Sequence, residues 1–83
     1  MSERMSYMTL CFRGNTEVTH INKNGVIEVA FEQAVHGGFN TLVMDLQGRV
    51  ISNNGFNNSE VEWMRDFTIR NAPIIKAESR GEI

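Results

Sequence analysis

The dipeptide Asn24-Gly25 constrains the fold of this chain more than any other short feature of its sequence. Asparagine and glycine both tolerate positive φ angles, so this pair is the strongest short signal for a two-residue β-hairpin turn. The segment that precedes it, residues 16–21, is rich in β-branched side chains, which favour strands. We therefore predict a hairpin at Asn24 and Gly25, with residues 16–21 as its first strand.

Two more segments have strand-like patterns. Residues 7–12 alternate between two faces with a period of two, as a strand does. Residues 39–54 contain two apolar runs joined by Asp45-Leu46-Gln47-Gly48, which has aspartate and glycine where a type I turn favours them. The sequence thus predicts a strand near its start and a second hairpin in its middle.

Residues 26–36 fit two templates. With a helical period, their apolar side chains share one half of a helix and the polar ones lie opposite. With a period of two, they read as a strand, which the preceding turn supports. We predict a short strand over 26–29 followed by a helix over 30–36, which Gly37 and Gly38 close. A single helix over the whole segment is the alternative.

A second helix is predicted from a capping box. Ser59 can cap the helix and Glu62 can reach back to it, so the helix begins near Glu60. Pro73 is expected to end it, because the residue before a proline is pushed out of the α region. Residues 73–78 then form a final strand.

The predicted order indicates a small α+β domain with a single antiparallel or mixed sheet of four to five strands and two helices on one face. It is close to βαββαβ, with an extra N-terminal hairpin strand. We expect one domain over residues 6–78, a flexible N-terminus over 1–5 and a flexible tail over 79–83. This order hosts many unrelated functions and predicts none by itself.

Charge and cysteine content narrow the class of protein. The 83 residues carry a net charge of −2, with acidic and basic side chains mixed, which favours neither a cationic nucleic-acid surface nor RNA recognition. Cys11, the single cysteine, lies in an apolar run, as expected in a reducing compartment. The first residues lack the apolar stretch of an export signal or membrane span. We expect a cytoplasmic protein that binds neither membrane nor nucleic acid.

The residues that could bind a metal or catalyse a reaction do not form a motif. Cys11, His20 and His36 are the possible soft or imidazole ligands, and their spacing matches no metal-binding pattern. A nucleophile could be paired with His20 and Glu17, or with His36 and Asp45, but nothing in the spacing requires it. We predict no metal, no cofactor and no enzymatic activity.

Protein binding has the clearest physical motive, because a core this small gains from association and a short sheet leaves edges uncovered. The candidate contact residues are apolar side chains expected at the surface: Phe56, Phe39, Ile69 and Val43. Phe56, flanked by asparagines, has two interpretations. It is either an interface anchor on a loop or a hydrophobic staple that packs onto Val61.

The sequence therefore predicts a small interaction or regulatory protein, of the kind that phages and mobile elements often encode. It would bind another macromolecule or itself, as a homodimer. The alternative is a protein that binds a small ligand, a nucleotide or metabolite, between two subunits. In that case arginines would hold the charged part of the ligand, the candidates being Arg13, Arg49 and Arg65.

Overall fold

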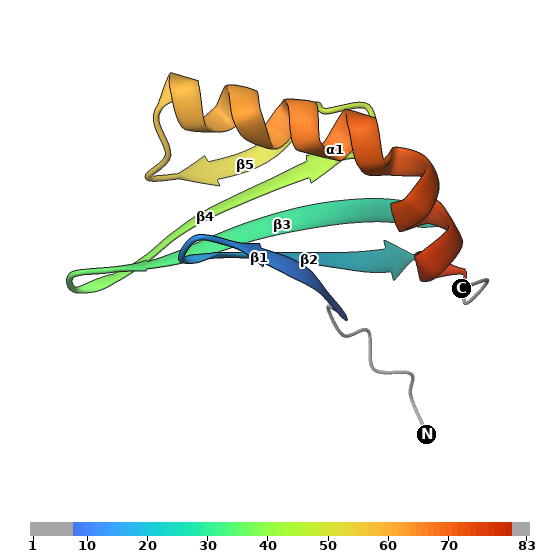
Figure 1. The fold of residues 1–83 in the computed structure, drawn as a ribbon, viewed down its shortest axis with the longest axis horizontal. Coiled ribbons are helices and arrows are strands. Elements are labelled where there is room, and N and C mark those ends of the chain that lie inside the picture. Colours follow the sequence, from blue (N-terminus) through green and yellow to red (C-terminus); the bar gives the residue numbers. More distant parts are fainter. Residues whose placement is uncertain (1–7, 81–83) are drawn as a thin grey trace.

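The structure is a computed structural model, and it describes residues 8–80. Five strands precede one helix (Figure 1): β1 (Met8–Arg13), β2 (Thr16–Lys23), β3 (Val26–Val35), β4 (Gly38–Asp45), β5 (Val50–Asn54) and α1 (Asn58–Ser79). Each strand pairs antiparallel with the next, so the sheet order is the chain order and β1 and β5 are its edges. The expected flexible ends lie largely outside the described residues.

Both predicted hairpins are confirmed. Asn24 and Gly25 have φ angles of 55° and 92°, the two positive values that a type I′ turn needs. In the β4–β5 connection, the N–H of Gly48 donates to the carbonyl of Asp45 at 3.0 Å. Gly48 then takes a φ of 85°, which completes a type I turn followed by a left-handed residue.

The predicted helix over residues 30–36 is wrong, because this segment continues β3 to Val35. Val29 and Phe31 are fully buried on one face, while Glu28, Ala30 and Glu32, which alternate with them, are more exposed. β3 also pairs along its length with both β2 and β4. Two ladders of backbone hydrogen bonds and a buried face outweigh the helical stripe that the same side chains form. Gly37, with a φ of 87°, lies in the β3–β4 turn and caps no helix.

The helix begins two residues earlier than predicted. Its N-cap is Asn57, whose side-chain oxygen accepts from the N–H of Glu60 at 2.9 Å. The N–H of Asn57 donates back to the Glu60 carboxylate at 3.1 Å. This is a complete capping box, so the predicted motif is present but formed by a different pair from Ser59 and Glu62.

The predicted end of the helix at Pro73 and the final strand over 73–78 are also wrong. α1 continues through Pro73 to Ser79, and its last turns bend toward β2 (Figure 1). A proline inside a helix removes one hydrogen bond and costs about 3 kcal/mol. That cost is offset because the following turn buries Ile75 in the core and because Ser79 contacts His20 at 2.9 Å.

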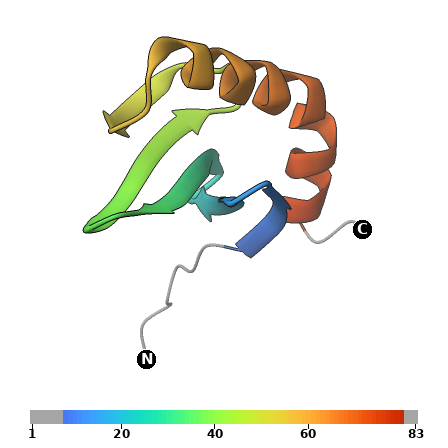
Figure 2. The same cartoon turned by 60° about the vertical axis from the view of Figure 1, so that its left-hand side comes forward.

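The chain is thus a small α+β domain, but the expected βαββαβ arrangement with two helices is wrong. A five-stranded antiparallel meander is covered on one face by the single helix α1 (Figure 2). Between sheet and helix lies one apolar cluster of buried residues: Val18, Ile27, Val29, Phe31, Leu42, Met44, Phe56, Met64 and Ile75. Trp63 and Phe67 pack edge-on against Phe31, with ring centroids 5.7 Å and 6.2 Å away.

Candidate functional site

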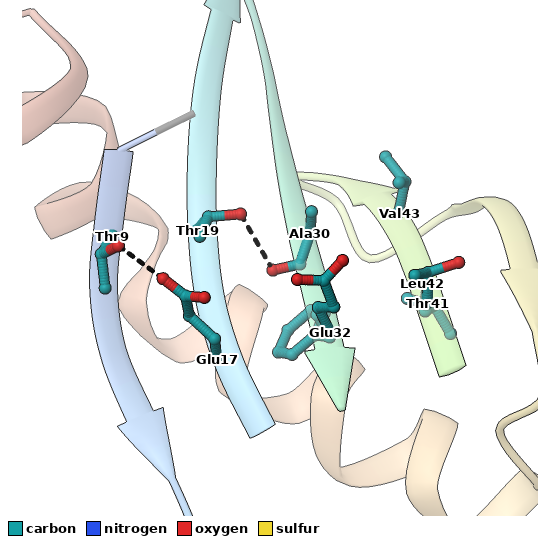
Figure 3. Close-up of a pocket in the computed structure, with 9 residues that line it drawn as sticks. Thr9, Glu17, Thr19, Ala30, Glu32, Thr41, Leu42 and Val43 are labelled. Atoms are coloured by element: carbon teal, nitrogen blue, oxygen red, sulfur yellow. Dashed lines mark hydrogen bonds between the residues drawn. The ribbon is translucent and has the colours of Figure 1, made fainter. Parts of the chain in front are cut away.

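The sheet face opposite α1 is the candidate site, and we call it the open face. Strand alternation and pairing place on it Thr9, Phe12, Glu17, Thr19, Ala30, Glu32, Phe39, Thr41 and Val43. Figure 3 shows most of these side chains projecting from β1 to β4 on the side away from the helix. Ile21 also belongs to the open face, because it is paired with Glu28. It is nevertheless buried, so part of this face is covered.

A shallow hollow of about 410 Å³ lies in the middle of the open face. Thr9, Glu17 and Thr19 line it from β1 and β2, and Glu32 and Val43 line it from β3 and β4 (Figure 3). Its volume falls in the range of small-ligand pockets, but its lining is mixed rather than mainly apolar. The hollow therefore suits a side chain or short segment better than an enclosed ligand.

Two carboxylates lie on neighbouring strands in this hollow. Glu17 and Glu32 are directly paired residues of β2 and β3, so their side chains leave the same face side by side. The hydroxyl of Thr9 donates to Glu17 at 2.6 Å. No cationic side chain pairs with either carboxylate among residues 8–80.

Every other carboxylate in the described part of the chain has a structural partner. Glu60 closes the capping box at the start of α1. The rest face a basic or imidazole side chain within 4.0 Å: Glu28 with Lys23, Asp45 with Arg49, Glu62 with Arg65, Asp66 with Arg70 and Glu78 with His20. Among residues 8–80, Glu17 and Glu32 are therefore the two carboxylates that neither face a basic side chain nor cap the helix, and Glu17 has only the Thr9 hydroxyl as a partner.

Exposed phenylalanines flank the carboxylates. Phe12 pairs with Glu17 across β1 and β2 and is 66 % exposed. Phe39, near the tip of the β3–β4 hairpin, is 58 % exposed. Large side chains exposed at this level around a concave polar centre have the composition of a protein-binding surface.

The structure separates the four predicted contact residues. Phe39 and Val43 lie on the open face of β4, and Val43 lines the hollow. Ile69 is 50 % exposed but belongs to α1, on the other side of the sheet. Phe56 is 6 % exposed and lies in the core, one residue before the N-cap and five before Val61, which packs against the same cluster. This is the geometry of the hydrophobic staple.

The asparagines around Phe56 fix its backbone. Asn53 accepts from the N–H of Phe56 and donates to its carbonyl, both at 3.1 Å. Gly55 has a φ of 109°, and a Cβ there would clash with the Asn40 side chain. The loop is therefore built to turn the chain and insert Phe56 into the core.

The three predicted ligand arginines do not meet in one site. Arg13 lies 4.6 Å above the ring of Trp63. Arg49 contacts Asp45 at 3.0 Å, and Arg65 donates to the carbonyl of Gly48 at 3.0 Å. Each thus has a structural contact, although Arg49 also lines a separate hollow near the end of α1.

The imidazole and thiol side chains are also dispersed. His20 is 3 % exposed, and its Nδ1 lies 2.9 Å from the Ser79 hydroxyl while its Nε2 lies 3.5 Å from Glu78. This serine, histidine and carboxylate tie the helix end to β2. His36 is exposed in the β3–β4 turn, and Cys11 packs against the core. Residues 8–80 hold no group of three or more metal-ligating side chains.

Phe12, Glu17 and Glu32 were not among the residues predicted to bind. A signal for them exists, because a two-residue turn at Asn24 and Gly25 fixes the register in which Glu17 faces Glu32. The helix predicted over residues 30–36 conceals that signal, because it takes Glu32 out of the sheet.

Comparisons of the chain with family models, curated proteins and solved structures find no match. Within the described residues, no helix has the length and apolar character that a membrane crossing requires.

Proposed function

We propose that this protein binds another protein through the open face, and that the bound segment presents a lysine or arginine flanked by apolar side chains. The observation that carries the proposal is the position of Glu17 and Glu32. These carboxylates lie together in a hollow, with Phe12 and Phe39 exposed beside them.

Folding alone does not account for this pair. Like charges placed directly opposite each other on neighbouring strands destabilise a sheet. Where a group of residues destabilises the fold and no other contact compensates for it, a functional role is the usual reason. A cation from a partner would compensate both carboxylates at once, and hydrogen bonds between charged groups are stronger than those between neutral ones.

The geometry also indicates the size of the bound segment. Strands lie about 4.8 Å apart, so β1 and β4, which carry Phe12 and Phe39, are separated by roughly 14 Å. An extended segment of roughly four residues spans that distance. Its central basic side chain would enter the hollow, and its outer apolar side chains would cover the phenylalanine rings.

A second copy of this chain fits the open face poorly. Two open faces packed together would bring Glu17 and Glu32 of both copies into one interface, and like charges there weaken association. The predicted homodimer would instead use an edge strand. β5 is the better edge for this, because all five of its residues are exposed. Sedimentation of the purified protein tests that prediction separately.

The proposal is tested by selecting binders from a displayed library of random twelve-residue peptides. We expect the enriched peptides to carry arginine or lysine between apolar residues. Binding should weaken at least tenfold on a Phe12→Ser, Phe39→Ser variant, because the apolar contacts are lost. Ile69→Ser is the matched control, since it removes an exposed apolar side chain from α1 instead.

Two results would overturn this function. One is that the selected peptides bind the Phe12, Phe39 variant as well as the native protein. The other is that Ile69→Ser weakens binding as strongly, which would move the contact surface to the helix. If instead the peptides need both phenylalanines but carry no basic residue, the surface stands and the role of the carboxylates fails.

A further inference from the structure

A second hollow, of about 450 Å³, has mainly basic residues among its charged side chains, whereas the charged side chains that line the hollow of the open face are acidic. It is bounded by the β2–β3 turn, the β4–β5 turn and the last turns of α1. Arg49, Lys76 and Arg80 contribute cationic side chains to its wall, and Asn22 and Gln47 contribute amides. We call this region the basic hollow.

Two basic side chains in the described part of the chain have no carboxylate or aromatic partner, and both lie here. Within residues 8–80, Lys23, Arg49, Arg65 and Arg70 each pair with a carboxylate, and Arg13 covers the Trp63 ring. Lys76 and Arg80 have no such partner among the described residues, and both line the basic hollow. In a chain whose net charge is −2, this is a local excess of positive charge.

The acidic residue in the wall does not cancel that excess. Asp45 accepts from the N–H groups of Gln47 and Arg49, both at 2.9 Å, and from the Arg49 guanidinium at 3.0 Å. Its charge is therefore paired with Arg49 within its own turn, and Lys76 and Arg80 stay without a carboxylate partner among the described residues. Interaction with the helix dipole favours cations in the last turn of α1, but it does not explain why they converge with Arg49 from another element.

The remaining wall suits an organic group attached to the anion. Val26, Ile27 and Leu46 provide an apolar surface, and Val26 is largely exposed. The side chain of Gln47 can donate to and accept from the edge of a nucleobase, and the amide nitrogen of Asn22 can donate, while the Asn22 oxygen accepts from the N–H of Gly25 at 2.7 Å. Arginine and lysine together are the usual partners of phosphate.

We propose that the basic hollow binds a phosphorylated small molecule of nucleotide size, with the phosphate on Lys76 and Arg80 and the organic part against Val26 and Leu46. This site lies within one chain and on different residues from the open face. It is independent of the protein-binding function proposed above.

Adenosine monophosphate and inorganic phosphate serve as probes, titrated at low salt while the backbone amide signals are followed by NMR. We expect the nucleotide to shift signals of the β2–β3 turn, the β4–β5 turn and the end of α1, and to bind more tightly than phosphate. A Lys76→Gln, Arg80→Gln variant should bind the nucleotide at least tenfold more weakly. Arg13→Gln, Arg70→Gln is the control, because it removes the same charge from two residues that do not line the basic hollow.

Three results would overturn the site. They are an absence of shifts with both probes, an equal loss of affinity in the control variant, and equal affinity for phosphate and nucleotide. A DNA oligonucleotide that binds far more tightly than the nucleotide, in proportion to the number of its phosphates, would also overturn it, since it would indicate a general polyanion surface.

Discussion

At the scale of single residues, Phe56 shows how the same sequence pattern can serve folding instead of binding. An aromatic among asparagines resembles a contact residue, yet Asn53 holds its backbone and its ring lies in the core. The sequence predicted both interpretations and could not choose between them, because burial depends on contacts with strands far away along the chain.

We expect Phe56→Ala to lower the free energy of unfolding by about 3 kcal/mol, since it leaves a cavity in a small core. Phe39→Ala should change it by less than about 0.5 kcal/mol, because that side chain is mostly exposed. Urea denaturation of both variants measures the difference. Equal stabilities would contradict the placement of Phe56 in the core.

The carboxyl group of Asp45 should make the free energy of unfolding depend on pH in the acid range. Burial by itself raises the pKa of its carboxyl group, but hydrogen bonds from the backbone and side chain of Arg49 and from Gln47 lower it, and the net pKa lies below its ordinary value. A lowered pKa in the folded state stabilises the protein above the unfolded-state pKa of about 3.9, and this stabilisation is lost as the pH falls further.

Asp45→Asn should therefore lose stability at pH 7 and should show a shallower decline of stability between about pH 5 and pH 2. Asp66→Asn, on the exposed side of α1, is the control for removing one carboxylate. The free energy of unfolding, measured by denaturant titration at several pH values, checks this. An unchanged acid profile in Asp45→Asn would show that the turn does not depend on the ionised form.

At the scale of elements, local signals predicted the turns well and the segments between them less well. Asn24, Gly25 and Gly48 specify their turns by backbone conformation, which is a property of those residues alone. Residues 30–36 and 73–78 were predicted wrongly because their state is decided by partners: two neighbouring strands in the first case, and the core around Ile75 in the second.

Pro73 destabilises α1 locally, so replacing it should stabilise the protein. We expect Pro73→Ala to raise the free energy of unfolding by about 1 kcal/mol, less than the full cost of an interior proline, because proline also restricts the unfolded chain. Hydrogen exchange of the amides of residues 74–79 should slow as well. Destabilisation would mean that the bend at Pro73 is needed to bring Ser79 to His20.

At the scale of the whole molecule, the charged side chains divide into those used in folding and those left over. The leftover acidic pair lies in the hollow of the open face, and the leftover basic pair lies in the basic hollow. Residue counts and net charge could not reveal this division, because it depends on strand register and on the continuation of α1 past Pro73 to Ser79, which places Lys76 and the C-cap residue Arg80.

The most direct test of this division needs no partner and no ligand. It is the free energy of unfolding of a Glu17→Gln, Glu32→Gln variant, measured by denaturant titration at low and at high salt. We expect the variant to be more stable than the native protein by about 0.5 kcal/mol at low salt, with the gain reduced at high salt because salt screens repulsion. A variant that is less stable at both salt concentrations would contradict the account, because it would show that the two carboxylates stabilise the folded protein.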